Sequence, residues 1–314
     1  MNEATFKRHF LPLGMSVAIV MALSFPGPGM VVKSWDLMRP AVMLVFLING
    51  LQSNFVVKDV NIRFFKAFLF LVLSSLILCP FLGQWLAEAI GLPPDLALGL
   101  VVMSAMPTTL TSGFVIAGVA GGSAVWSMLF TMGLNLAGIV TIPFVLTLVL
   151  KSGDVHLSPW PLLYNLLQMV FCPYVIGCVL KKWLSPAGPF KLLLSHIPTF
   201  CIILVAWASV SASAENVLHR PMNVLLWSIL AVVLVHVQLL CLHYGGAQWL
   251  TLNLPETKSF VILGSQKTLP IALSVLTALH LEQVGSAVMI CLMFHFLQLL
   301  LDSWLAGRWA KKMA

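Results

Sequence analysis

The chain has 314 residues, of which 60% are hydrophobic and only 9% are charged, and its formal net charge is +7. Soluble domains carry roughly a quarter charged residues, so this composition excludes a soluble protein and indicates one that lies in the lipid bilayer. The positive charge is typical of basic residues in cytoplasmic loops, and no basic face with interleaved aromatic residues suggests a nucleic-acid partner.

Ten apolar stretches, separated by glycines, prolines and charged residues, follow one another along the chain. A helix needs about 20 apolar residues to cross the roughly 30 Å hydrocarbon core. We therefore predict an all-α membrane protein with ten transmembrane helices. In chain order these spans are residues 11–25, 40–52, 66–90, 95–119, 123–150, 160–184, 193–214, 222–250, 257–279 and 284–305.

Lysine and arginine residues gather on one side of this arrangement. Because basic residues are enriched in cytoplasmic loops, we expect both termini in the cytoplasm and a multi-pass protein of the plasma (inner) membrane. The basic side holds Lys7, Arg8, Lys58, Arg63, Lys66, Lys181, Lys182, Lys191, Lys258, Arg308, Lys311 and Lys312. The opposite side holds Lys33, Arg39, Lys151 and Arg220, and Lys267 fits neither set.

An internal repeat relates the fourth predicted span to the ninth. The segments "LPPDLALGLVVMSAMPTTL" (residues 92–110) and "LPETKSFVILGSQKTL" (residues 254–269) share a Leu-Pro start, an acidic residue, an apolar half-span and a Thr-Leu end, half a chain apart. With five spans in each half, the second copy enters the membrane from the opposite side. This pattern predicts inverted repeats over residues 1–155 and 156–314, as in many secondary transporters.

A proline and a run of small polar residues interrupt both of these spans near the middle. Pro107 is followed by Thr108, Thr109 and Ser112, and "GSQKTLP" ends in Pro270. Proline removes a backbone donor and disfavours helix in the residue before it, so both helices should open there. Freed backbone groups are tolerated where they line a cavity or an ion. We predict a central binding site, with two simple proline kinks as the alternative.

Lys267 lies in the second interruption, about 15 Å from either end of its span at 1.5 Å per residue. A charge at that depth costs at least about 2.5–3.5 kcal/mol, so the side chain should face the central site or be neutral. Every Asp and Glu, Asp302 included, is predicted near a span end or in a loop. The partner of Lys267 is then an anionic substrate or an exchangeable proton. Alternatively, backbone carbonyls hold the lysine and it only stabilises the crossing.

Three histidines, His236, His243 and His295, lie within the eighth and tenth predicted spans. We predict buried imidazoles held by hydrogen bonds, with a proton relay as the alternative. The chain has no metalloprotease, hydrolase or phosphate-loop motif and no paired carboxylates, so it is not expected to be an enzyme.

Three phrases carry a family resemblance: "MPTTLTSGFVIAGVAGGS" (residues 106–123), "WSMLFTMGLNLAGIVTIP" (residues 126–143) and "GSQKTLPIALSV" (residues 264–275). With the ten-span pattern they resemble the bile acid:sodium symporter superfamily, in particular its bile-acid-symporter-like branch, related to solute carrier family 10 member 7. The resemblance implies that spans one, two, six and seven form a panel domain, that the other six form a core domain, and that broken spans four and nine cross within the core.

The same resemblance implies which positions correspond to the sodium ligands of the family. Ser112, Ser127 and Thr131 keep hydroxyls, Ser75 replaces a glutamine, and Gln266 matches. However, Gly113 replaces an asparagine, Ile262 the shared glutamate and Lys267 the second asparagine. Hard cations bind oxygen and not isoleucine. We therefore hypothesise that the Lys267 amine is a tethered cation in place of sodium, surrounded by Thr108, Ser112, Ser127, Thr131 and nearby backbone carbonyl groups.

The predicted function is secondary transport of a small organic anion by alternating access, independent of sodium, with protons as a candidate coupling ion. One alternative is a sodium-coupled symporter of organic anions of the bile-acid type, and another is a non-transporting regulatory membrane protein. No cofactor is expected and bound sodium is doubtful; the partners are the substrate and the bilayer, and the oligomeric state is open. The candidate substrate- or ion-binding residues are Ser75, Thr108, Thr109, Ser112, Ser127, Thr131, Gln266, Lys267 and Thr268.

Overall fold

A computed structural model describes most of the chain, and every regular element in the described part is a helix. The basic residues Lys58, Lys151 and Lys312, which entered the prediction of orientation, lie outside the described residues. The structure describes residues 3–52, 61–110, 112–150, 158–184, 188–212, 214–279 and 284–311.

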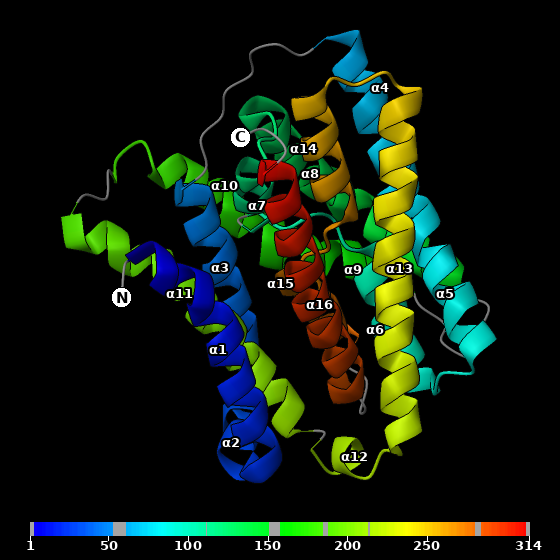
Figure 1. Ribbon diagram of the computed structural model, residues 1–314. Helices are drawn as coiled ribbons and strands as arrows, with labels where there is room; N and C mark the ends of the chain where they lie inside the picture. The colour runs from blue at the N-terminus through cyan, green and yellow to red at the C-terminus, as the bar shows by residue number, and fades with distance from the viewer. Residues whose placement is uncertain are drawn as a thin grey trace.

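Each of the ten predicted apolar stretches coincides with one helix or with consecutive pieces of helix (Figure 1). Two short π-helical segments, η1 and η2, interrupt the third and sixth stretches. The elements are α1 (Glu3–Ser24), α2 (Pro26–Ser34), α3 (Met38–Gln52), α4 (Ile62–Leu71), η1 (Val72–Leu78), α5 (Cys79–Ile90), α6 (Pro94–Ala105), α7 (Ser112–Val119), α8 (Ala124–Leu150), α9 (Pro159–Leu166), η2 (Leu167–Phe171), α10 (Cys172–Leu180), α11 (Gly188–Ser211), α12 (Ala214–Leu218), α13 (Met222–Trp249), α14 (Leu254–Ser265), α15 (Leu269–Ala278) and α16 (Val284–Lys311).

Several of these helices are long and apolar enough to cross a membrane. Among the described residues six candidate spans meet this condition, or seven if α1 and α2, which meet at a bend of 100°, form one span. Three further apolar helices are shorter, Met38–Gln52, Pro94–Ala105 and His196–Ser211. The protein is therefore a multi-pass membrane protein, and ten spans stay a prediction. The six candidate spans are Ile62–Ile90, Ala124–Leu150, Pro159–Leu180, Met222–Trp249, Leu254–Ala278 and Ser286–Ala310.

The helices of the second half begin at a constant interval after those of the first. Helices α4, α6 and α8 begin at residues 62, 94 and 124, and α13, α14 and α16 begin at residues 222, 254 and 284. The residues that end α6 and α14 also share one backbone geometry, with φ −71° and ψ 148° at Met106 and φ −74° and ψ 148° at Gln266. The two halves thus place three successive helices with the same spacing.

The fourth and ninth stretches are interrupted where the prolines predict. In Figure 1, α14 lies in the upper half of the view and α6 in the lower half, and α7 and α15 continue them beyond the breaks. The breaks touch, because the N–H of Thr268 donates to the carbonyl oxygen of Pro107 at 2.8 Å. These contacts confirm the two predicted interruptions and bring them to one place in the fold.

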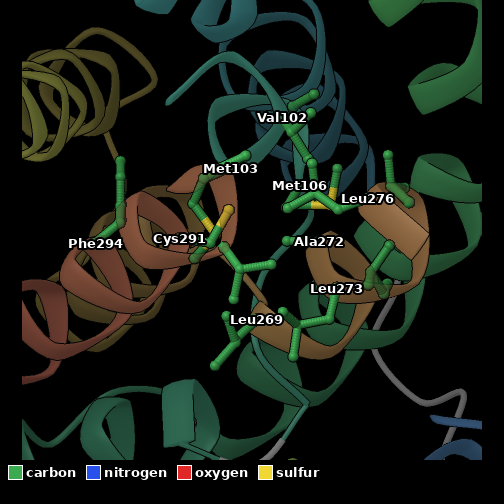
Figure 2. Close-up of a cluster of buried hydrophobic side chains, with 14 of the residues drawn as sticks. Val102, Met103, Met106, Leu269, Ala272, Leu273, Leu276, Cys291 and Phe294 are labelled. Carbon is green, nitrogen blue, oxygen red and sulfur yellow. The ribbon is translucent and has the colours of Figure 1, made fainter. Parts of the chain in front are cut away.

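An apolar cluster holds the two breaks against α16. Figure 2 shows side chains from α6, α15 and α16 converging beside the point where the breaks meet, and all of them are buried. Close packing of such side chains, with many small dispersion contacts, supplies much of the association energy between membrane helices. The cluster therefore positions α16 beside the breaks. Its labelled members are Val102, Met103, Met106, Leu269, Ala272, Leu273, Leu276, Cys291 and Phe294.

The π-helical segment η1 leaves one backbone carbonyl group without its helical donor. The N–H of Cys79 donates to the carbonyl oxygen of Ser74, five residues back. The next residue, Pro80, has no N–H to donate. The carbonyl oxygen of Ser75, which an ordinary helix would pair with Cys79, is therefore available to a partner outside the helix.

Helices α1, α2, α3, α10 and α11 lie together at the left of Figure 1, and glycines bring the backbones of α3 and α10 into close contact. A Cβ atom on Gly50 would lie 2.1 Å from the carbonyl oxygen of Tyr174, and one on Gly177 would lie 2.1 Å from that of Leu47. Only glycine allows the two backbones to approach this closely.

We expect Gly177→Ala to lower the thermal unfolding midpoint of the detergent-solubilised protein by several degrees, since overpacking costs about 1–3 kcal/mol. Gly245→Ala on α13 is the matched control, because a Cβ atom there would meet nothing within 4 Å. Equal midpoints for the two variants would show that the helices separate at no cost.

Candidate functional site

Lys267 lies in the break between α14 and α15 and is fully buried. Its amine donates to the carbonyl oxygen of Ser75 at 2.6 Å and to the Ser75 hydroxyl oxygen at 2.9 Å. The thiol of Cys79 is a further neighbour of the amine. Among the described residues no carboxylate forms an ion pair with Lys267. The amine is therefore held by the carbonyl group that η1 leaves without a helical donor.

The peptide groups of Lys267 are held by one side chain of α16. The Lys267 N–H donates to Oε1 of Gln298 at 2.8 Å, and Nε2 of Gln298 donates to the Lys267 carbonyl oxygen at 2.7 Å. Gln298 is fully buried, and its Nε2 also lies 3.1 Å from Nδ1 of His295. This two-point contact replaces the hydrogen bonds that the chain loses by leaving the helix.

Gln266, the preceding residue, connects the two breaks to α16. Its Oε1 accepts from the Thr109 hydroxyl group at 2.6 Å, and its Nε2 donates to Oδ2 of Asp302 at 2.8 Å. The other carboxylate oxygen, Oδ1, lies 2.9 Å from Nε2 of His236. Gln266, Asp302 and His236 are all fully buried, so a continuous polar chain crosses the interior of the protein.

Asp302 corrects the prediction that every carboxylate lies near a span end or in a loop. Helix α16 continues to Lys311, so Asp302 lies well inside it and is 0% exposed. The prediction ended the last span at residue 305 because Arg308 and Lys311 were assigned to a loop. A single acidic residue between the apolar runs "LQLLL" and "WLAG" was the signal that could have identified it.

Lys258, which the prediction assigns to the basic side of the membrane, lies in the second turn of α14 and is only 2% exposed. The helix begins earlier than its apolar pattern suggests, because Asn253 caps it and forms a capping box with Glu256.

Two hydroxyl groups at the first break, those of Thr109 and Ser112, are hydrogen-bonded to each other. Thr109 donates to Gln266 and accepts from the Ser112 hydroxyl group at 2.9 Å and from the N–H of Gly113 at 2.7 Å. The Thr109 side chain thus satisfies a backbone donor at the start of α7. Thr109, Ser112 and Gln266, three of the predicted site residues, therefore lie together.

Thr108 lies against α8. Its carbonyl oxygen accepts from Nδ2 of Asn135 at 3.0 Å, and the same nitrogen donates to the carbonyl oxygen of Thr131 at 2.7 Å. The Thr108 hydroxyl group and Oδ1 of Asn135 are buried and have no hydrogen-bond partner in the described part of the chain. Asn135 was not predicted as a site residue, although it lies one helical turn after Thr131 on the same face.

Ser127 and Thr131 belong to a third group of contacts. Ser127 donates to the hydroxyl group of Ser259 at 2.9 Å, and Thr131 donates to the Ser127 carbonyl oxygen at 2.7 Å. The predicted hydroxyl groups of Thr108, Ser112, Ser127 and Thr131 form no hydrogen bond with the lysine amine, whereas the predicted contact with a backbone carbonyl group is present, at Ser75. Of the predicted residues, Ser75 is the one that binds the amine, through the carbonyl oxygen that η1 leaves without a helical donor and through its hydroxyl oxygen.

The three histidines are buried and hydrogen-bonded, as predicted. His243 lies 3.0 Å from the hydroxyl oxygen of Ser74 through Nε2 and 2.9 Å from that of Ser265 through Nδ1. It therefore joins η1 to the end of α14. His236 contacts Asp302, but its Nδ1 has no partner among the described residues.

Buried charges and interrupted helices at the middle of a multi-pass helical protein are typical of membrane transporters. The described residues contain no cluster of three His, Cys, Asp or Glu side chains that could hold a metal ion. The chain belongs to the SBF-like CPA transporter family, whose model matches residues 9–311. It is a transporter and not an enzyme. The predicted family resemblance is confirmed as far as membership of this transporter family.

The names of similar proteins are consistent with this family, because they describe transporters. The chain is 27% identical, over 97% of its own length and 73% of the relative's, to a protein of Arabidopsis thaliana named "Probable sodium/metabolite cotransporter BASS4, chloroplastic". It is 26% identical, over 77% of its length and 73% of the relative's, to a Bacillus subtilis protein named "Uncharacterized sodium-dependent transporter YocS".

Proposed function

We propose that the protein is a secondary transporter that moves a small metabolite together with a cation, and that sodium is the coupling ion. The observation that carries the proposal is the meeting of two interrupted helices at a fully buried polar chain, where Thr109 contacts Gln266 and Gln266 contacts Asp302. Such interrupted helices form the ion and substrate sites of many secondary transporters. The names of the relatives support sodium and a metabolite as the transported species.

The proposed architecture is ten spans in two inverted repeats, residues 1–155 and 156–314, with panel and core domains that move against each other. The constant interval between the helix starts of the two halves supports the repeats. The grouping of α1, α2, α3, α10 and α11 in Figure 1 supports a separate panel. We also retain the plasma membrane, cytoplasmic termini and kinship with the branch related to solute carrier family 10 member 7 as parts of the proposal.

A second candidate function follows from Lys267. Its buried amine has no carboxylate partner in the described residues and contacts Ser75, a position that the resemblance relates to a sodium ligand. In this alternative the amine acts as a permanent internal cation. The protein then transports a small organic anion without sodium, driven by protons or by the substrate gradient. A non-transporting regulatory role has no observation in its favour.

Thermal unfolding of the purified protein in detergent distinguishes the two candidates without a known substrate. We expect sodium chloride to raise the unfolding midpoint above that in potassium or choline chloride at equal ionic strength. A ligand at 100 times its dissociation constant adds about 2.7 kcal/mol to the free energy of unfolding. Identical midpoints in the three salts would remove sodium coupling and leave the second candidate.

A further inference from the structure

Asp302 is a fully buried carboxylate within the candidate span Ser286–Ala310. A charged side chain in the middle of a membrane helix costs at least about 2.5–3.5 kcal/mol, so such residues are usually retained for function and face a partner. In the described residues the carboxylate contacts the Gln266 amide and the His236 imidazole. The amide is neutral, and the imidazole is charged only when it is protonated. Neither group therefore supplies a permanent positive charge next to Asp302.

The Lys267 amine and this carboxylate bind different partners. Lys267 follows Gln266 in the chain, but the two side chains leave the break toward different elements. The Lys267 amine binds Ser75 in η1, whereas the Gln266 amide binds Asp302 in α16. The buried negative charge is therefore not neutralised by Lys267 and is available to a mobile cation.

The side chains linked to Asp302 supply the oxygen donors that an alkali cation prefers. Besides the two carboxylate oxygens, the chain contains Oε1 of Gln266 and the hydroxyl oxygen of Thr109, which are 2.6 Å apart. These atoms come from α16 and from both helix breaks. A cation held by them would replace the hydrogen bonds from Thr109 to Gln266 and from Gln266 to Asp302, and would connect the three elements. Hard cations are bound by carboxylate, amide and hydroxyl oxygens of this kind.

The hydrogen bonds of the carboxylate leave acceptor capacity for a cation. An ionised carboxylate has about four lone-pair sites. Gln266 uses one site on Oδ2, and His236 lies within hydrogen-bond distance of Oδ1. The two contacts orient the carboxylate from opposite oxygens. His236 thus acts as a positioning residue, because it contacts the carboxylate and not the breaks.

We propose that Asp302, together with the side-chain oxygens of Gln266 and Thr109, binds the sodium ion that drives transport. The inference rests on the proposed function and assigns its coupling ion to residues of this chain. Asp302 supplies the negative charge, and Gln266 and Thr109 transmit occupancy of the site to the two helix breaks.

The test is a sodium titration of the thermal unfolding midpoint, with choline replacing sodium at constant ionic strength. We expect Asp302→Asn to weaken the apparent sodium affinity at least tenfold relative to wild type. Asp36→Asn is the matched control, since Asp36 is largely exposed and its positive φ of 51° suits asparagine. This control should keep the wild-type affinity.

Each outcome supports or overturns a defined statement. If wild type responds to sodium and Asp302→Asn responds equally, the assignment to Asp302 is overturned while sodium coupling stands. If wild type does not respond, the sodium-coupled function and this inference are both overturned. Should Asp302→Asn fail to fold, Asp302→Glu keeps the charge but moves it, and an unchanged sodium affinity in that variant overturns the assignment.

Discussion

Replacing Lys267 by methionine is expected to increase the affinity of the protein for sodium about tenfold, or to create a sodium response if the wild type has none. Two unit charges about 10 Å apart interact by about 1.7 kcal/mol at an effective dielectric constant of 20, which is somewhat more than a tenfold change in affinity. The amine repels any cation near the neighbouring Gln266 and Asp302. Methionine fills a similar volume without the charge.

The measurement is the same sodium titration of the unfolding midpoint, with Lys267→Arg as the control that keeps the positive charge. The midpoint of Lys267→Met without sodium should stay near that of wild type. The variant loses two hydrogen bonds to Ser75, but it no longer buries a cation, and the two effects are of similar size. Equal sodium affinities in the methionine and arginine variants would mean that the amine has no electrostatic influence on the ion site.

Gln298→Leu is expected to cause the largest loss of stability among single substitutions at the helix crossing. Leucine removes both hydrogen bonds to the Lys267 peptide groups. The N–H and carbonyl groups left unpaired are buried, and each costs about 1–3 kcal/mol. We therefore expect the unfolding midpoint in detergent to fall by much more than it does for a substitution at an exposed position. The sodium response should also weaken, because Gln298 no longer holds the break between α14 and α15.

Gln238→Leu provides the control for this experiment, because Gln238 is exposed on α13 and the same change of residue should there be nearly neutral. Gln298→Glu separates the two contacts, since a carboxylate still accepts from the Lys267 N–H but cannot donate to its carbonyl group. An intermediate midpoint is expected for this variant. If Gln298→Leu unfolds at the wild-type temperature, water molecules must form the hydrogen bonds to the Lys267 N–H and carbonyl groups in place of Gln298.

The positions of the helices and of their interruptions could be predicted because they depend on local properties of the chain. Apolar length determines which segments can cross a bilayer, and Pro107 and Pro270 disfavour helix at the residue before them. The pairing of Thr109 with Gln266 also follows once the two interruptions are placed at the same depth. The least accurate part was the end of the last helix, where basic residues were taken as a loop although the helix continues.

The chemical surroundings of Lys267 could not be predicted, because they depend on a helical irregularity. The sequence shows a Cys-Pro pair after Ser75, but an unpaired carbonyl group at Ser75 requires both the π-helical turn and the missing N–H of Pro80. The hydroxyl groups that were expected around the amine have closer partners, such as Ser259 for Ser127. The local sequence does not show which of these competing hydrogen bonds each hydroxyl group forms.

The sequence by itself determined that this protein lies in a membrane, that its fourth and ninth apolar stretches are interrupted, and that a lysine lies in one of these interruptions, since hydropathy and proline act over short distances. Only the tertiary structure decided that Lys267 binds Ser75 and that Asp302 joins Gln266 and His236. These contacts connect residues far apart in the chain, and which side chains meet depends on how the helices pack and on where each helix ends.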